Sequence, residues 1–282
     1  MEKIQAAIAK ARATRKGEAA PDAPVSAVLR ADRPEIPADP APGVGVAEAW
    51  AALLSFAPDP RRLVEAHVVT QVGCAEASPF DALRTRVLQQ MRAQGWRRLA
   101  ITSPGPACGK STLALNLAFS LARQPDLRVI LAEVDLRRPS LSRILGHRPS
   151  NGFADVLRGT QPFADQALRF GNNLAIALSP IPVHSPAELL HSPGVTEVLA
   201  NIDATYAPDI TIFDLPPMLA SDDVMAFLGQ VDCALLVAAA EASTVKEVDV
   251  CERDIASRSN VLGVVLNKCR YRDTDYGYDY GY

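Results

Sequence analysis

The 282-residue sequence predicts an α/β protein with a doubly wound, mostly parallel sheet. One observation is the alternation of short apolar runs with helical patterns, which is typical of βαβ units. The apolar runs lie at 98–102, 128–134, 210–214, 233–238 and 261–266. The other observation is that polar and acidic motifs follow several of these runs directly. Parallel sheets bind ligands at the carboxyl ends of their strands, so these motifs are candidate site residues.

Helical periodicity fills the segments between the apolar runs. We expect helices near 79–93, 110–123 and 243–258. A further helix is expected around 46–56 and would pack back onto the main body. These elements together predict one main domain at residues 46–267.

The two ends of the chain differ in composition from this domain. Residues 1–16 form a short amphipathic pattern, which fits either a docking helix or a frayed, solvated terminus. Residues 17–45 are rich in proline and alanine and contain no aromatic residue, so we expect a disordered linker. Residues 268–282 are expected to form a mobile C-terminal tail.

Bulk composition limits the possible function classes. A net charge of −3 argues against a nucleic-acid partner. No uncharged apolar run approaches the roughly 18 residues of a membrane span, and the first residues lack the apolar core of a secretory signal. The five cysteines are scattered, and the four histidines show no metal-ligand spacing with them. We therefore expect a cytoplasmic protein without a structural metal.

The segment from Thr102 to Thr112 ends like a Walker A phosphate loop and joins a predicted strand to a predicted helix. In such a loop Lys110 would bridge the β- and γ-phosphates, and the Ser111 hydroxyl would ligate Mg²⁺. Pro104 stands where the first glycine of the motif belongs. The loop predicts a P-loop NTPase-type fold with ATP and Mg²⁺ as cofactors, and the predicted nucleotide contacts are Gly105, Pro106, Ala107, Cys108, Gly109, Lys110, Ser111 and Thr112. Cys108 could be a redox-sensitive thiol or simply a small residue that fits a tight loop.

Two other predicted strands end in acidic residues. Glu133 and Asp135 are two positions apart, so in an extended strand they would face the same side. Asp214 ends the run at 210–214 and occupies the Walker B position, which usually holds Mg²⁺ through water. For Glu133, an exposed strand-end acid or a helix cap is a serious alternative.

Tyrosine is concentrated at the C-terminus. Five of the six tyrosines lie in the last twelve residues, at Tyr271, Tyr276, Tyr278, Tyr280 and Tyr282. Aspartate and glycine stand between them, which favours a soluble tail over a folded strand. From Asn267 the tail could reach up to roughly 50 Å. An aromatic docking strip or a low-complexity end is the alternative interpretation.

Three motifs together resemble the Walker A, A′ and B motifs of the bacterial tyrosine autokinases that control capsule and exopolysaccharide synthesis. They are the phosphate loop, the Glu133-x-Asp135-x-Arg137-Arg138-Pro139 stretch and Asp214-Leu215-Pro216-Pro217. The similarity extends over about residues 76–270. It implies a kinase that transfers phosphate from Mg-ATP to the tyrosines of its own tail.

The resemblance also implies roles for single residues. It makes Lys110, Glu133, Asp135 and Asp214 the catalytic set, with Glu133 as the base toward the tyrosine hydroxyl. Asp135 would join Ser111 and Asp214 at the Mg²⁺, and Asn267 would contact the adenine. Asp223 matches a further aspartate of the family, and the family usually has Asp where this sequence has Glu133.

Partners are implied in the same way. The resemblance implies a homo-oligomer, a separate membrane-spanning chain-length regulator that recruits the chain to the inner face of the plasma membrane, and a phosphatase for the tail. The family's Glu-x-x-Arg-x-x-Arg ring motif falls here on Ser78, Asp81 and Arg84, so only its last position is retained.

Two other functions stay open. A partitioning or positioning ATPase of the deviant Walker class would carry an additional lysine near the start of the loop, where this sequence has Gly105. A nucleotide-binding regulatory subunit without transfer activity would be compatible with Glu133, Ala107 and Asp81. The tyrosine-rich tail argues against the first of these alternatives only.

Overall fold

The computed structural model describes residues 45–269 of the chain. These residues belong to one compact unit. The predictions for 1–16, for the linker up to residue 44 and for the five tail tyrosines concern residues outside this range. The domain boundaries therefore stay predictions.

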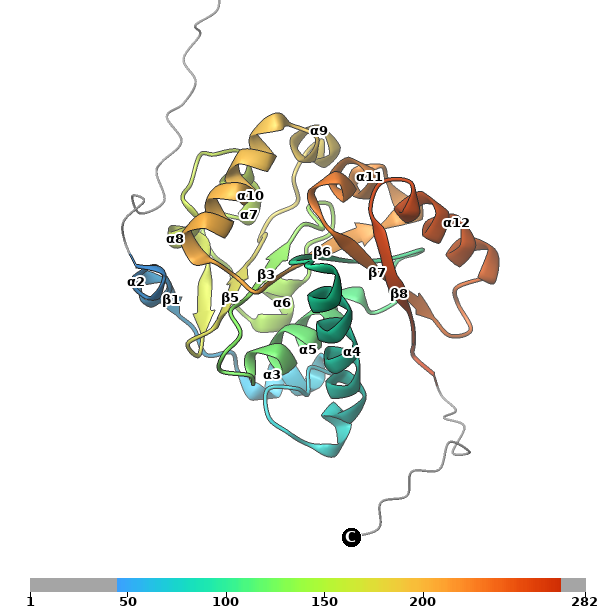
Figure 1. Cartoon of the computed structure of the whole chain (residues 1–282), viewed down its shortest axis with the longest axis horizontal. Helices are drawn as coiled ribbons and strands as arrows, with labels where there is room; N and C mark the ends of the chain where they lie inside the picture. Colours follow the sequence, from blue (N-terminus) through green and yellow to red (C-terminus); the bar gives the residue numbers. More distant parts are fainter. Residues whose placement is uncertain (1–44, 270–282) are drawn as a thin grey trace, which may run out of the picture. The chain divides into compact units, whose positions relative to one another are not determined.

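A single eight-stranded sheet runs through the described residues, in the order β1-β4-β5-β3-β6-β2-β7-β8 (Figure 1). All neighbouring strands are parallel except β4 and β5, which are antiparallel. This confirms the predicted α/β fold with a mostly parallel sheet. The strands span Leu54–Ser55 (β1), Arg98–Ser103 (β2), Val129–Glu133 (β3), Leu168–Phe170 (β4), Leu174–Ala177 (β5), Ile210–Pro217 (β6), Cys233–Ala239 (β7) and Asn260–Asn267 (β8).

Three of these strands differ from the expectation. The strands β1, β4 and β5 have two, three and four residues, and runs this short give no clear periodicity. The helix expected over 46–56 ends earlier, at Ala52, because the backbone of Leu53 is extended with ψ of 142°. Leu54 and Ser55 can then pair with β4, so they form the edge strand β1 rather than a last helical turn.

Helices cover both faces of the sheet, as a doubly wound fold requires (Figure 1). One face is covered by α3 (Pro60–Glu65), α4 (Ser78–Gln94), α5 (Lys110–Ala122) and α6 (Leu141–Leu145). The other is covered by α2 (Val46–Ala52), α7 (Phe153–Leu157), α8 (Phe163–Gln166), α9 (Pro186–Leu190), α10 (Pro193–Tyr206), α11 (Asp223–Phe227) and α12 (Val245–Ala256). Short 3-10 turns lie at Ala75–Ala77, Met218–Ala220 and Leu228–Gln230.

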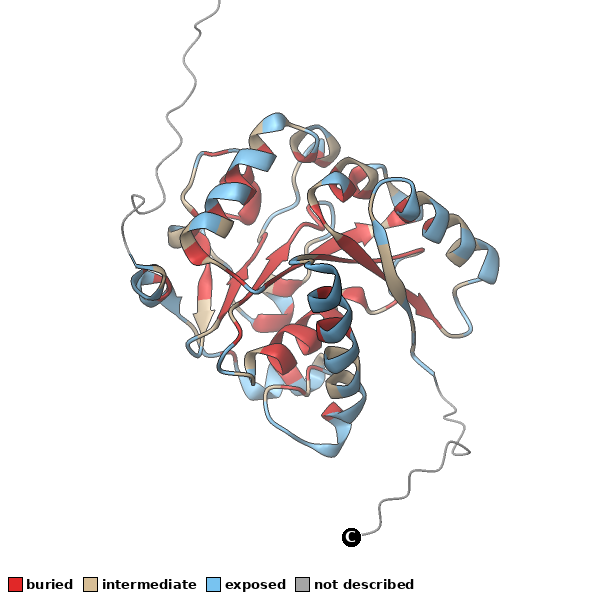
Figure 2. Ribbon diagram, in the orientation of Figure 1, coloured by how far each residue is buried: buried red, intermediate tan, exposed pale blue. Residues whose placement is uncertain are grey.

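Each face of the sheet has its own apolar core, and the inner strands β2, β3, β5, β6 and β7 are almost wholly buried, whereas the edge strands β1 and β8 are largely exposed or half-buried (Figure 2). Side chains of one strand alternate between the two cores. In β2, Ala100 belongs to one core, whereas Leu99 and Ile101 belong to the other. Within residues 45–269, none of the helices has the length and hydropathy that a membrane crossing requires.

The strand order brings the predicted motifs together at one edge. The strand β6 lies between β3 and β2. Asp214 of β6 is in register with Glu133 of β3 on one side and with Ile101 of β2 on the other. The loop that follows β2, the loop that follows β3 and the end of β6 therefore meet at the carboxyl end of the sheet.

Candidate active site

The phosphate loop is shaped by two residues with left-handed backbone conformations. Ala107 has φ of 60° and Gly109, which precedes α5, has φ of 92°. A Cβ atom on Gly109 would lie 2.3 Å from Nδ2 of Asn267, so only glycine fits there without displacing Asn267. The backbone N–H groups of Ala107, Cys108 and Gly109 donate to no described residue. These free donors next to a helix N-terminus can cradle phosphate oxygens.

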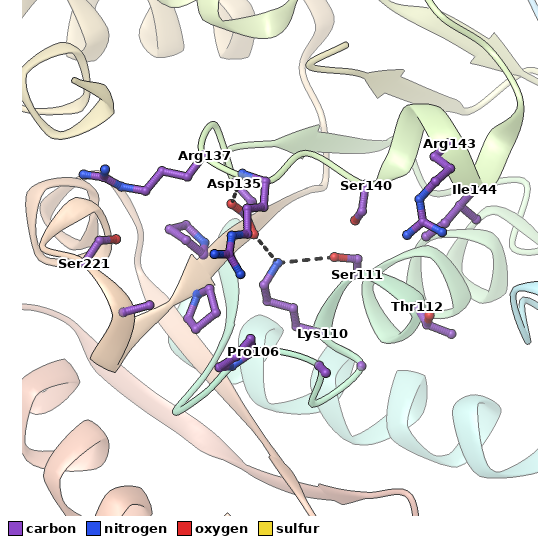
Figure 3. A pocket seen from close by; sticks show the side chains of 16 residues that line it. Pro106, Lys110, Ser111, Thr112, Asp135, Arg137, Ser140, Arg143, Ile144 and Ser221 are labelled. Atoms are coloured by element: carbon purple, nitrogen blue, oxygen red, sulfur yellow. Dashed lines mark hydrogen bonds and ion pairs between the residues drawn. The ribbon is translucent and has the colours of Figure 1, made fainter. Parts of the chain in front are cut away.

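Lys110 lies at the centre of the site and pairs with two carboxylates. Its Nζ lies 2.7 Å from Oδ2 of Asp135 and 3.5 Å from Oδ1 of Asp214. Nζ is also 3.3 Å from Oγ of Ser111, and Figure 3 shows the lysine between Asp135 and Ser111. Burial lowers the pKa of Lys110, but the charges of Asp214 and Asp135 outweigh burial and the pKa is raised overall. The lysine is therefore a firmly charged cation.

Asp214 is buried and poorly satisfied. No hydrogen bond of good geometry reaches either of its carboxylate oxygens from the described residues, and its charged neighbour Lys110 lies 3.5 Å from Oδ1. Burial raises its pKa, and the charge of Lys110 only partly opposes that effect. A buried carboxylate without hydrogen bonds fits a site that receives a further cation. Asp214, Asp135 and the Ser111 hydroxyl therefore suit Mg²⁺, which prefers oxygen ligands.

The metal site would depend on the nucleotide. Within residues 45–269, no group of three or more His, Cys, Asp or Glu side chains could hold a metal ion by itself. Mg²⁺ keeps waters and commonly shares its coordination between one or two carboxylates and substrate phosphates. Two aspartates and one serine next to a phosphate loop match that pattern.

Glu133 has a different position from the one expected for a base. Its Oε1 accepts hydrogen bonds from the N–H groups of Ser140 and Leu141, at the start of α6, and Oε2 accepts from the N–H of Ser179 at 2.8 Å. The side chain is fully buried and does not line the cavity described below. Burial raises the pKa of Glu133 to about 7, although the three N–H donors oppose this rise. Glu133 is a helix cap, and its predicted role as base finds no support in this geometry.

The chain geometry explains why the two acids separate. The N–H groups of Val134 and Asp135 both donate to the carbonyl oxygen of Asp214, each at 2.9 Å. One carbonyl that accepts from two consecutive residues ends the regular strand after Glu133. The spacing of two therefore does not place both carboxylates on the same side. Asp135 turns to Lys110, whereas Glu133 turns to α6.

A cavity of about 540 Å³ opens in front of Lys110. Figure 3 shows Arg137 and Arg143 on opposite sides of the lysine. Of the acidic residues in the described range, only Asp135 lines this cavity, whereas Asp214 lies beneath its surface. The lining residues are Pro106, Ala107, Gly109, Lys110, Ser111, Thr112, Asp135, Arg137, Arg138, Ser140, Arg143, Ile144, Pro216, Pro217, Ala220 and Ser221.

Six of the nine predicted nucleotide contacts line this cavity, and three do not. Asn267 at the end of β8 donates through Nδ2 to the carbonyl oxygen of Cys108 at 2.9 Å, so it braces the phosphate loop. Cys108 is buried, and its Sγ lies 3.2 Å from the carbonyl oxygen of Gly105. Gly105 itself is outside the lining set.

Asp223 holds one of the cavity arginines in place. Nε and Nη2 of Arg137 donate to Oδ2 and Oδ1 of Asp223, the second at 3.0 Å, and the Ser221 hydroxyl donates to Oδ2 at 3.0 Å. Asp223 is buried, whereas Arg137 is exposed. The match of Asp223 to an aspartate of the resembled family was the signal for this residue. Arg143 gave none, because α6 has only five residues and was not predicted.

The ring-motif positions on α4 form an internal network. Oδ1 of Asp81 accepts from Arg84 at 3.2 Å and from Arg123 at 2.9 Å, and it also accepts from the Ser120 hydroxyl. Asp81 therefore ties α4 to α5 within the chain.

Comparison with known proteins agrees with this geometry. Residues 99–277 match the model of the CobQ/CobB/MinD/ParA nucleotide binding domain. The chain is 29% identical to the tyrosine-protein kinase YwqD of Bacillus subtilis, over 74% of this chain and 89% of that protein. It is 32% identical to the tyrosine-protein kinase wzc of Salmonella typhimurium, over 71% of this chain. The chain spans about a quarter of the length of most of its curated relatives, and 28% of wzc.

A solved structure points to the same group of proteins. The kinase domain of the Escherichia coli tyrosine kinase ETK superposes with a TM-score of 0.65 at 28% identity, covering 74% of this chain and 81% of that one. The fold, the phosphate loop and the matched range agree with one another. The chain belongs to the family of the CobQ/CobB/MinD/ParA nucleotide binding domain, and its relatives there include bacterial tyrosine-protein kinases.

Proposed function

We propose that this chain is a Mg-ATP-dependent protein-tyrosine kinase that phosphorylates the tyrosine cluster of its own C-terminal tail. The observation that carries the proposal is Lys110 paired with Asp135 and Asp214 below a phosphate loop whose N–H groups are free. The similarity to proteins named tyrosine-protein kinases supports the choice of tyrosine as acceptor. The five tyrosines at 271–282 supply the acceptors.

In the proposed reaction a tail tyrosine attacks the γ-phosphorus of ATP. A bond forms between the phenolic oxygen and phosphorus, and the bond from phosphorus to the β–γ bridging oxygen breaks, so ADP leaves with the electron pair. The phenolic proton passes to one carboxylate oxygen of Asp135, because that carboxylate lines the cavity. Mg²⁺ would be held by Ser111, Asp214 and the other oxygen of Asp135, and would neutralise charge on the phosphates.

Nucleotide binding requires Lys110 to exchange partners. In the described state Nζ is bound to Asp135 and lies near Asp214. Transfer of the lysine to the phosphates would leave both carboxylates without their cation, and a bound Mg²⁺ would supply the positive charge that they then lack. We therefore expect nucleotide and metal to favour each other's binding.

Mass spectrometry of the full chain tests the proposal. The protein is incubated with Mg-ATP, and phosphotyrosine is mapped and compared with a chain in which all five tail tyrosines are changed to Phe. We expect phosphate on residues 271–282, and loss of that phosphate in Lys110→Ala. ATP binding without transfer would instead indicate a regulatory subunit, and steady ATP hydrolysis without protein phosphate would indicate a partitioning-type ATPase.

The biological setting is also a proposal. Relatives named for succinoglycan transport and for tyrosine phosphorylation support a role in exopolysaccharide synthesis or export. We propose a cytoplasmic homo-oligomer that a separate membrane-spanning regulator recruits to the inner face of the plasma membrane, with a phosphatase that resets the tail. Phosphorylation measured with and without membranes from the producing cell tests whether such an activator exists.

A further inference from the structure

We propose that Arg138 and Arg143 form a cationic rim that selects tyrosines flanked by aspartate, and that its occupant is the chain's own segment 270–282. This inference rests on the proposed kinase function, because it names the acceptor sequence that the same site prefers. It assigns acceptor recognition to two arginines that the nucleotide motifs leave without a role.

The three cavity arginines are not equivalent. Arg137 is neutralised by the buried Asp223 and lies 3.9 Å from Asp222. The side chains of Arg138 and Arg143 form no hydrogen bond or ion pair with any residue in the described range. Both are exposed, and both line the cavity. Two arginines without partners at the mouth of a site are a surface ready to receive anionic groups.

The backbone holds these arginines close to the reacting groups. The N–H of Arg138 donates to Oδ1 of Asp135 at 3.0 Å, and the other oxygen of Asp135 binds Lys110. Arg143 lies on α6, the helix whose first N–H groups are held by Glu133. Glu133 thus fixes the helix that carries one side of the rim. Both side chains originate from anchored backbone, so their exposed ends stay near the cavity mouth.

The positive charges of the rim are not balanced by acidic side chains of the described residues. Lys110 is matched by Asp135 and Asp214, and Arg137 is matched by Asp223. The phosphates of a bound nucleotide have the loop N–H groups, Lys110 and Mg²⁺ as their partners. Arg138 and Arg143 therefore remain available to the acceptor.

The part of the tail around residues 275–280 has the complementary charge. Arg270 and Arg272 begin the segment, whereas residues 273–282 contain three aspartates and no lysine or arginine. Asp275 directly precedes Tyr276, and Asp279 stands between Tyr278 and Tyr280. Arginine binds carboxylates through paired N–H groups, so an aspartate next to a tyrosine can set the position of the hydroxyl. From residue 269, the last described position, the chain reaches Tyr276 over roughly 24 Å and Tyr282 over roughly 44 Å when extended.

The test uses a peptide acceptor and a full-length enzyme that cannot compete with it. In this acceptor-free chain the five tail tyrosines are changed to Phe and the three tail aspartates to Asn, so the tail keeps only the charges of Arg270 and Arg272 and of its terminus. The acceptor is a synthetic peptide of residues 270–282, compared with the same peptide carrying Asn at its three aspartate positions. KM and kcat are measured for each peptide, and KM is measured for ATP.

We expect the Asn peptide to show a KM about five- to twentyfold higher with kcat little changed, since exposed ion pairs contribute modestly each. The double variant R138Q/R143Q should raise KM for the native peptide to the same level and abolish the difference between the two peptides. Its KM for ATP should stay within about twofold. The matched control is Arg148→Gln, an exposed arginine outside the cavity lining.

A charge-reversed enzyme and a charge-reversed peptide separate the loss of charge recognition from structural damage to the rim. R138E/R143E should have a strongly raised KM for the native peptide and a low KM for a peptide with Lys at the three aspartate positions. Equal KM values for the native and Asn peptides would overturn the proposal. A rise in the KM for ATP, with peptide preference retained, would also overturn it and assign the arginines to the nucleotide phosphates.

Peptide binding separates this inference from the kinase proposal. The fluorescence anisotropy of a labelled native peptide measures its binding to the rim, even when no phosphate is transferred. Tighter binding of the native than of the Asn peptide, lost in R138Q/R143Q, supports the rim although the kinase proposal fails. Equal binding of both peptides overturns the rim whatever the activity.

Discussion

Nζ of Lys110 and Oδ2 of Asp135 form an ion pair of 2.7 Å next to the phosphate loop. Asp214 lies next to this pair, with its carboxylate buried and without hydrogen bonds. The lysine thus has two functions in the structure: it is the predicted phosphate ligand, and it is the cation that keeps two buried acids tolerable. Its substitution should affect folding as well as catalysis.

We expect Lys110→Met to lower the free energy of unfolding by about 3 kcal/mol at pH 8, because it removes one partner from a buried charge cluster. The loss should shrink as the pH is lowered, since the pKa of Asp214 is raised and a protonated acid needs no cation. Urea unfolding at pH 8 and at pH 5 measures this, with Lys268→Met, at the exposed residue that follows β8, as control. An equal loss at both pH values would contradict the explanation.

Glu133 should make stability depend on pH. Its pKa is raised from 4.5 to about 7, so the folded state binds a proton that the unfolded state releases above pH 4.5. The contribution of this group is therefore fully present below pH 4.5 and falls by about 3 kcal/mol as the pH rises to 7. Glu133→Gln cannot titrate, so the stability difference between wild type and variant should change by that amount over this window. Guanidinium unfolding from pH 4.5 to 7.5 measures it, and two parallel pH profiles would refute it.

The two neighbouring acids should differ in their effect on phosphate transfer. Asp135→Asn should lower the transfer rate by at least about 100-fold, because that carboxylate lines the cavity and is the proposed proton acceptor. Glu133→Gln should lower the transfer rate by less than about tenfold under conditions where the variant stays folded, because the Glu133 carboxylate binds only backbone N–H groups. Initial rates of tail phosphorylation compare them. The reverse order would restore Glu133 as the base.

The two loop glycines should also differ. Gly109→Ala should destabilise the protein by about 1–3 kcal/mol, because φ is 92° and the new Cβ would lie 2.3 Å from the Asn267 amide. It should weaken ATP binding as well, since the loop must shift. Gly105→Ala is the matched control for stability, because its Cβ would meet no atom within 4 Å. Thermal unfolding distinguishes the two, and equal losses would show that the Asn267 contact is unimportant.

The sequence predicts the five longer strands, including those that carry the chemistry, and misses the three short ones. The strands β2, β3 and β6 are apolar runs long enough to recognise, and each is followed by functional groups. The strands β1, β4 and β5 are too short to show a period, and their pairing depends on residues far away in the chain.

The candidate site shows the same limit. The phosphate loop, Asp135 and Asp214 could be placed because strand ends converge in any parallel sheet. The opposite directions of Glu133 and Asp135 could not, because they depend on two N–H groups that share the carbonyl of Asp214. The cap that Glu133 provides was an open alternative, but choosing it requires knowing that α6 begins at Leu141.

That shared carbonyl has a consequence for how the site tolerates change. The main chain of Asp214 positions the main chain of Asp135, so the spacing of the two carboxylates is set by peptide groups that every sequence possesses. These contacts use main-chain atoms alone, so they do not require particular side chains in either core. The separation of the two acids therefore depends little on the surrounding side chains. Chains that share only about a third of their residues can keep the same pair of charges at the same separation.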